Sequence, residues 1–138
     1  AGIRLGILLG AQAWIGLLDR VRMPYNVNSL TQATAAFAID HSEYFQSIIE
    51  VIVKERERMM HFMVGLESIT VWPSDGNFIL FRPCSMTSDH VHQELRNRGI
   101  LIKNLSGSHS ALLNCLRVTI GTEAENTLFR ESLTEIMR

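Results

Sequence analysis

The spacing of apolar residues changes near residue 67, and this change restricts most strongly how the chain can fold. In residues 42–65 apolar side chains recur every three or four positions, which is typical of one face of a long α-helix. After it, residues 68–73 and 77–82 are short apolar runs separated by Ser74-Asp75-Gly76, a turn sequence. The sequence therefore predicts one long helix followed by a region that contains a sheet.

The region after residue 67 continues in the order strand, strand, helix, strand, strand, helix. Thr87 is expected to cap a helix, and Thr122 with Glu125 forms a capping box that starts the last helix. This order indicates an α/β fold in which helices cover one sheet. After the long helix, we also expect a helix at 88–98, strands at 100–105 and 116–121, and a last helix that starts at residue 123. Before the long helix, we expect a buried strand at 3–9 and helices at 12–21 and 29–39. The helix at 29–39 is expected to begin with a capping box of Ser29 and Gln32.

Composition and charge exclude several classes of protein. The chain has 138 residues, 46% of them hydrophobic, which suits one domain or a small domain with part of another. A net charge of -1 provides no basic surface for nucleic acid. Cys84 and Cys115 form neither a disulfide framework nor a metal motif, and reduced cysteines suit a cytoplasmic protein. The apolar start is too short to span a membrane. We therefore expect no metal, nucleic-acid or membrane partner.

Two arginines lie in apolar runs and are candidates for binding an anion. Arg117 stands between Leu116 and Val118, and Arg4 lies in the run that opens the chain. Because an unpaired buried cation is costly, such a side chain must reach solvent, a structural partner or a bound anion. A guanidinium holds a carboxylate or phosphate with two parallel hydrogen bonds. From the residues alone, a solvent-facing or structurally paired arginine is the more common alternative for both.

Five motifs follow one another along the chain: AGIRLG (1–6), PYNVNSLTQATA (24–35), VWPSDGNFILFR (71–82), GILIKNLSG (99–107) and CLRVTIGTEAEN (115–126). In order and spacing they resemble the C-terminal part of histidinol-phosphate aminotransferases. Through these motifs the chain resembles pyridoxal-phosphate enzymes of the aspartate-aminotransferase type, fold type I. The resemblance implies that 1–40 ends the large cofactor-binding domain with its last strand and helices, that 41–66 is a connecting helix, and that 67–138 is the C-terminal small domain.

The resemblance also implies roles for individual residues. Arg4 would contact the phosphate of pyridoxal 5'-phosphate, and Arg117 would bind the substrate α-carboxylate or the phosphate end of histidinol phosphate. Lys103 falls where many members carry an arginine near the substrate phosphate. The lysine that forms the Schiff base with the cofactor is expected upstream of Ala1, so no catalytic residue is expected within the chain.

The function implied by the resemblance is amino transfer in histidine biosynthesis. Histidinol phosphate and 2-oxoglutarate would give imidazole acetol phosphate and glutamate, in a cytoplasmic homodimer. The isolated chain is expected to be inactive and to bind no cofactor. Two alternatives remain open from the sequence. One is a non-catalytic, stand-alone binding module with the small-domain fold, and the other is an enzyme similar to threonine-phosphate decarboxylase.

Overall fold

The computed structural model describes residues 3–138 and divides into two compact units. These units are Ala1–Ser47 and Ile48–Arg138, and the boundary falls inside helix α3 (Ser42–Val64). The expected division into 1–40, 41–66 and 67–138 stays a prediction. Within residues 3–138, no helix combines the length and apolar character that a membrane crossing requires.

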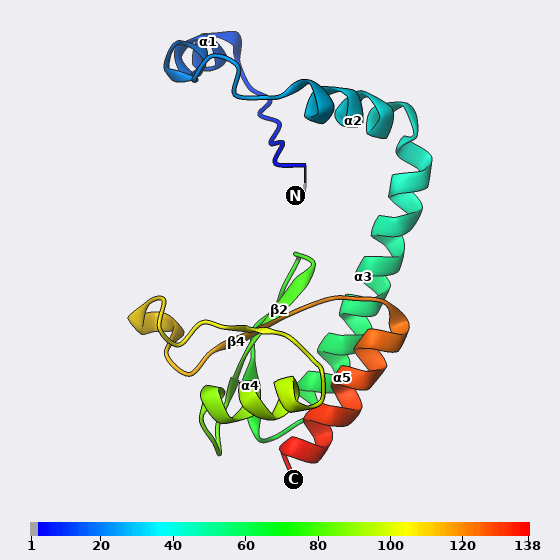
Figure 1. Ribbon diagram of the computed structural model, residues 1–138, viewed down its shortest axis with the longest axis vertical. Coiled ribbons are helices and arrows are strands. Elements are labelled where there is room, and N and C mark those ends of the chain that lie inside the picture. Colours follow the sequence, from blue (N-terminus) through cyan, green and yellow to red (C-terminus); the bar gives the residue numbers. More distant parts are fainter. Residues whose placement is uncertain (1–2) are drawn as a thin grey trace. The chain divides into compact units, whose positions relative to one another are not determined.

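The second unit contains an antiparallel sheet of four strands (Figure 1). Its strands are β1 (Ile69–Val71), β2 (Phe78–Pro83), β3 (Lys103–Asn104) and β4 (Leu116–Thr119), arranged in the order β1-β2-β4-β3. Successive side chains of a strand point to opposite faces, so one face of β2 buries Ile79 and Phe81. The strand predicted at 100–105 is wrong in extent, because only Lys103 and Asn104 pair with β4 at this sheet edge.

Three helices cover the buried face of the sheet and confirm the α/β fold. They are α4 (Ser88–Asn97), α5 (Glu123–Ile136) and the part of α3 that belongs to this unit. The core is made of Met59 and Met63 of α3, Ile69, Ile79, Phe81, Leu116, Val118 and Ile120 of the sheet region, Val91 and Leu95 of α4, and Phe129 and Leu133 of α5.

The predicted N-caps of α4 and α5 are both present. The Thr87 side chain accepts a hydrogen bond from the backbone N–H of His90 at 3.3 Å. Thr122 and Glu125 form the complete capping box, in which the Thr122 N–H donates to the Glu125 carboxylate at 2.7 Å. Gly99, just after α4, has a φ of +78°, a conformation that glycine adopts without a Cβ penalty.

One prediction for the first unit is wrong, because residues 3–9 form no strand. Ile7, Leu8 and Leu9 are 74%, 64% and 89% exposed rather than buried. An extended segment becomes a strand only when a neighbour accepts and donates its backbone hydrogen bonds, and no strand lies beside it in the described part of this unit. The segment is instead tied to α2 by one contact, in which the Thr31 hydroxyl donates to the Ile3 carbonyl at 3.1 Å.

The two helices predicted in the first unit are present, with a different cap on the second. They are α1 (Gln12–Val21) and α2 (Ser29–Asp40). The expected capping box of Ser29 and Gln32 is wrong. Asn28 is the N-cap, and its side chain accepts from the Thr31 N–H at 2.9 Å. Asn is as effective a cap as Ser, so the helix begins one residue earlier than a Ser29 cap would place it.

Candidate anion-binding site

Arg117 lies on the face of the sheet that the helices do not cover in this unit. Its neighbours Leu116 and Val118 are buried in the core, so strand alternation turns Arg117 to the opposite face. In the strand register Arg117 stands opposite Leu80 of β2 on one side and Lys103 of β3 on the other. The structure therefore brings together two of the three predicted site residues, Arg117 and Lys103, on one face.

The pairing of Arg117 with Lys103 is electrostatically unfavourable by itself. Like charges directly opposite one another on an antiparallel pair destabilise the sheet. Among residues 3–138, no carboxylate lies within 4.0 Å of either cation to offset this repulsion. An anion bound at this pair would supply the missing negative charge.

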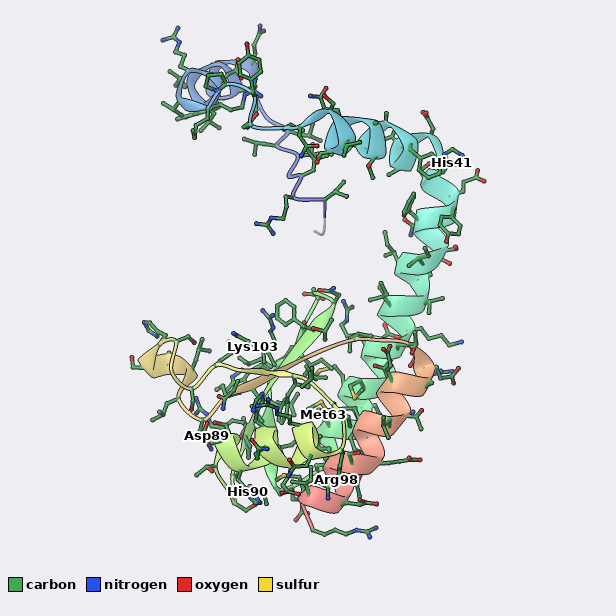
Figure 2. The ribbon with its side chains drawn as sticks, viewed as in Figure 1. His41, Met63, Asp89, His90, Arg98 and Lys103 are labelled. Atoms are coloured by element: carbon green, nitrogen blue, oxygen red, sulfur yellow. The ribbon has the colours of Figure 1, made fainter. Side chains whose placement is uncertain are left out.

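Asp89, the acidic residue at the start of α4, makes its contact on the other side of the sheet. Figure 2 labels Asp89 on α4 and Lys103 on β3. The Asp89 carboxylate accepts a hydrogen bond from the Asn104 side-chain amide at 2.6 Å. Asn104 pairs with Leu116, a core residue, so this contact belongs to the helix-covered side. Asp89 is thus engaged away from the face that carries Arg117.

The Arg117 guanidinium is oriented by an aromatic ring. Its central carbon lies 5.1 Å from the centroid of the Phe78 ring, within the range of a cation–π interaction. Its Nε is buried and has no hydrogen-bond partner within the described chain. Within the described residues, Arg117 is therefore not an arginine held by a structural hydrogen-bond partner. A half-buried guanidinium with an unsatisfied donor suits a bound anion.

Arg82 is a cation on the same face that sequence reasoning missed. It follows Leu80 by two positions on β2, so both side chains share a face. Its central carbon lies 5.2 Å from the Trp72 ring centroid, and one terminal nitrogen donates to the Ala111 carbonyl at 3.1 Å. Like Arg117, Arg82 is a cation at an apolar run of the sequence, NFILFR, and this signal marks it as a candidate.

The connection between β3 and β4 is held in place by Asn114. Its φ of +59° is a left-handed conformation that asparagine tolerates better than most residues. The side-chain amide donates to the Pro83 carbonyl at 3.0 Å and to the Met86 carbonyl at 3.2 Å. The Asn114 N–H donates to the Ser106 hydroxyl at 2.7 Å. These bonds anchor the loop three residues before Arg117 to the end of β2.

The comparisons with known proteins settle the family. The model of the aminotransferase class I and II family matches residues 1–133. The chain belongs to this family. A histidinol-phosphate aminotransferase of Nitrosococcus oceani is 44% identical over 133 residues, which are 96% of this chain and 37% of the relative. The chain spans between 34% and 38% of the length of the curated relatives that it matches.

Two solved enzyme structures share the fold of the chain. The histidinol-phosphate aminotransferase of Sinorhizobium meliloti, solved with pyridoxal-5'-phosphate, aligns with a TM-score of 0.70 and 21% identity, over 88% of this chain and 33% of its own. L-threonine-O-3-phosphate decarboxylase of Porphyromonas gingivalis aligns with a TM-score of 0.74 and 22% identity, over 94% of this chain and 40% of its own. The expected fold type I architecture is thereby confirmed.

Members of this family use pyridoxal phosphate, and Arg4 is the residue expected to contact its phosphate group. Arg4, in the first unit, is exposed, and its side chain makes no hydrogen bond or ion pair with residues 3–138. A free guanidinium fits a phosphate group. The cofactor also requires a lysine for covalent attachment. The chain has two lysines, and Lys54 is exposed on α3 while Lys103 lies on the sheet beside Arg117.

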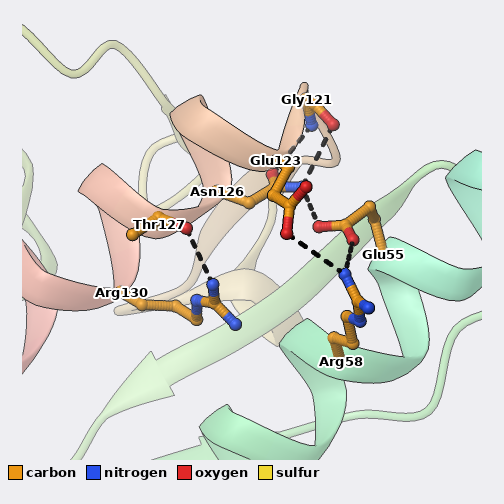
Figure 3. A network of polar contacts seen from close by, with 7 residues as sticks. All are labelled: Glu55, Arg58, Gly121, Glu123, Asn126, Thr127 and Arg130. Carbon is orange, nitrogen blue, oxygen red and sulfur yellow. Dashed lines mark hydrogen bonds and ion pairs between the residues drawn. The ribbon is translucent and has the colours of Figure 1, made fainter.

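A buried polar network connects α3, α5 and the loop that follows β4 (Figure 3). Glu55 is 5% exposed, and its carboxylate accepts from the Asn126 amide at 3.0 Å and from the Arg58 guanidinium at 2.6 Å. Asn126 also exchanges two hydrogen bonds of 3.0 Å with the Gly121 backbone. Because Gly121 follows the strand of Arg117, this network fixes the end of that strand.

The Glu55 carboxylate makes the stability of the second unit depend on pH. The hydrogen bond from Asn126, aided by Arg58, lowers the pKa of Glu55 below its ordinary value of 4.5, although burial opposes this shift. A lowered folded-state pKa contributes stability that is present above the unfolded value and is lost as pH falls through the folded value. We expect thermal stability to decline below about pH 4.5, and Glu55→Gln to reduce the steepness of that decline in a melting-temperature series.

The matched control for this series is Glu57→Gln, an exposed position on the same helix. That variant should follow the parental curve. A Glu55→Gln curve with the parental slope below pH 4.5 would assign the acid sensitivity to other carboxylates.

Proposed function

We propose that the protein containing this chain is a pyridoxal-phosphate-dependent histidinol-phosphate aminotransferase of histidine biosynthesis. It would transfer the amino group of histidinol phosphate to 2-oxoglutarate, and we place it in the cytoplasm as a homodimer. The observation that carries this proposal is the registered pair of Arg117 and Lys103, which has no carboxylate partner in the described chain. The 44% identity to a relative of that name supports the choice of substrate.

Different residues of the chain bind the substrate and the cofactor. Arg117, oriented by Phe78, binds the anionic end of the substrate through its guanidinium fork. Lys103 adds a second positive charge from the neighbouring strand, as a point charge without a fork. Arg4 binds the phosphate of the cofactor. When bound, pyridoxal phosphate supplies an electron-withdrawing ring that stabilises negative charge at the reacting carbon. Holding the substrate by its far end orients that carbon.

The substrate is tested by assaying the protein that contains this chain on two phosphate monoesters. With histidinol phosphate and 2-oxoglutarate, we expect formation of glutamate. With threonine phosphate, the substrate of the decarboxylase that shares the fold, we expect no release of CO₂. The reverse pattern would assign a decarboxylase, and inactivity with both substrates would favour the stand-alone binding module.

We also propose that residues 1–138 alone are inactive, because they lack the lysine that attaches the cofactor. Incubating the chain with pyridoxal phosphate and then borohydride should leave no stoichiometric label on a single lysine, as measured by peptide mass spectrometry. Lys103 is the critical position, since Lys54 lies on an exposed helix face. Stoichiometric labelling of Lys103 that is abolished in Lys103→Arg would contradict the proposal.

A further inference from the structure

We propose that Arg82 is a binding residue of the same site, and that it makes the site selective for a phosphate dianion over a carboxylate. This inference rests on the proposed function, because it names a further contact to the anionic end of the same substrate. It concerns a residue outside the predicted set of Arg4, Lys103 and Arg117.

The sheet register places Arg82 beside Arg117. Leu80 stands directly opposite Arg117, and Arg82 is two residues further along β2 on the same face. Such diagonal neighbours on an antiparallel pair lie about 7 to 8 Å apart, within reach of long side chains. Lys103 stands opposite Arg117 on the other side. Three adjacent strands thus contribute one cation each to this face.

The two arginines share an unusual state of hydrogen bonding. Each guanidinium lies over an aromatic ring, Arg82 over Trp72 and Arg117 over Phe78. Each has a buried Nε without a partner, and in residues 3–138 these two nitrogens are the only buried side-chain polar atoms in that condition. Unsatisfied buried donors are rare in folded proteins, so this shared condition singles out the two arginines from the other polar side chains of the described residues.

A purely structural role does not account for Arg82. Its contacts to the Ala111 carbonyl at 3.1 Å and the Cys115 sulfur at 3.3 Å use one terminal nitrogen only. No carboxylate of the described chain lies within 4.0 Å of it. The guanidinium is therefore anchored at one corner and keeps other donors for a ligand.

Charge decides which ligand this arrangement favours. Arg117 and Lys103 alone would already offset a dianion, and a third cation adds attraction that grows with ligand charge. A phosphate monoester carries close to two negative charges near neutral pH and three acceptor oxygens, whereas a carboxylate carries one charge and two oxygens. Arg82 should therefore contribute more to phosphate than to carboxylate binding.

The test is a titration of the 138-residue chain, with nitrogen-15 labelled arginine, by inorganic phosphate and by acetate at pH 7.5. We expect the Nε–H signals of Arg82 and Arg117 to shift together with one dissociation constant for phosphate. Arg82→Met should weaken phosphate binding about tenfold and acetate binding less than threefold. Arg96→Met, an exposed position on α4, is the matched control and should bind both anions as the parent does.

Several outcomes would overturn the inference. A shift of the Arg117 signal without the Arg82 signal would do so, as would parental phosphate affinity in Arg82→Met. If that variant fails to fold, as judged by its amide spectrum, the same titration is carried out with Arg82→Lys. This variant keeps the charge but loses the fork, so phosphate affinity should fall about threefold, and unchanged affinity would reject Arg82 as a ligand contact.

The titration needs no turnover, so its result is independent of the proposed reaction. If the complete protein does not act on histidinol phosphate while both signals shift, the proposed function fails and the anion site stands. If it does act on histidinol phosphate and Arg82→Met leaves the KM for that substrate unchanged, the inference about Arg82 fails alone. A rise in that KM that exceeds the rise in the KM for 2-oxoglutarate would support both.

Discussion

Replacing Arg117 with alanine in the complete protein should lower kcat/KM for histidinol phosphate by about 30- to 1,000-fold. This range corresponds to about 2 to 4 kcal/mol, the usual effect of removing a charged contact from a partly buried site. The loss follows because Arg117 is half-buried, oriented by Phe78 and unpaired within the described chain. The measurement is steady-state kinetics with both the amino donor and the acceptor.

Further variants separate substrate binding from structural effects. Arg117→Lys should recover only part of the loss, because an ammonium group cannot form two parallel hydrogen bonds. Arg4→Ala should instead weaken retention of the cofactor, measured as its release on dilution. If Arg117→Ala lowers the melting temperature but leaves the kinetics unchanged, Arg117 supports the sheet rather than the substrate.

Replacing Asn126 with alanine should lower the free energy of unfolding of the second unit by about 3 kcal/mol. The substitution leaves the Glu55 carboxylate short of one donor and both Gly121 backbone groups without their partner. Removing one member of a buried hydrogen-bonded group costs about 1 to 3 kcal/mol, and more when the remaining member is charged. Denaturant unfolding monitored by circular dichroism measures this change.

A matched control exists on α4. Asn97 also makes side-chain hydrogen bonds, to Gln93 and Glu94, but it is exposed. Asn97→Ala should change stability by less than about 0.5 kcal/mol, as surface substitutions usually do. Equal effects for the two asparagines would show that the network around Glu55 contributes nothing beyond surface hydrogen bonding.

The elements that sequence reasoning located correctly depend on local interactions. Thr87 and Thr122 cap α4 and α5 because an N-cap contacts backbone only two or three residues away. The long helix α3 follows the three- and four-residue spacing of its apolar side chains. Such signals act within one or two helical turns, so they can be read without knowing the rest of the fold.

The error at residues 3–9 has the opposite cause. An apolar run is compatible with a buried strand, but pairing depends on a second segment that supplies hydrogen bonds. Within the described residues Ile7, Leu8 and Leu9 have no such partner and are exposed. The cap of α2 shows the same difficulty at short range, because Asn28 and Ser29 are both good caps and only the backbone conformation selects Asn28.

The sequence by itself determined the family, the helices and turns of the second unit, and the presence of cations within apolar strands. Only the tertiary structure decided that β4 lies between β2 and β3, which places Arg117 between Leu80 and Lys103 and brings Arg82 onto the same face. The physical reason is that the order of strands in a sheet depends on packing and hydrogen bonds between segments far apart in the sequence, which local patterns do not specify.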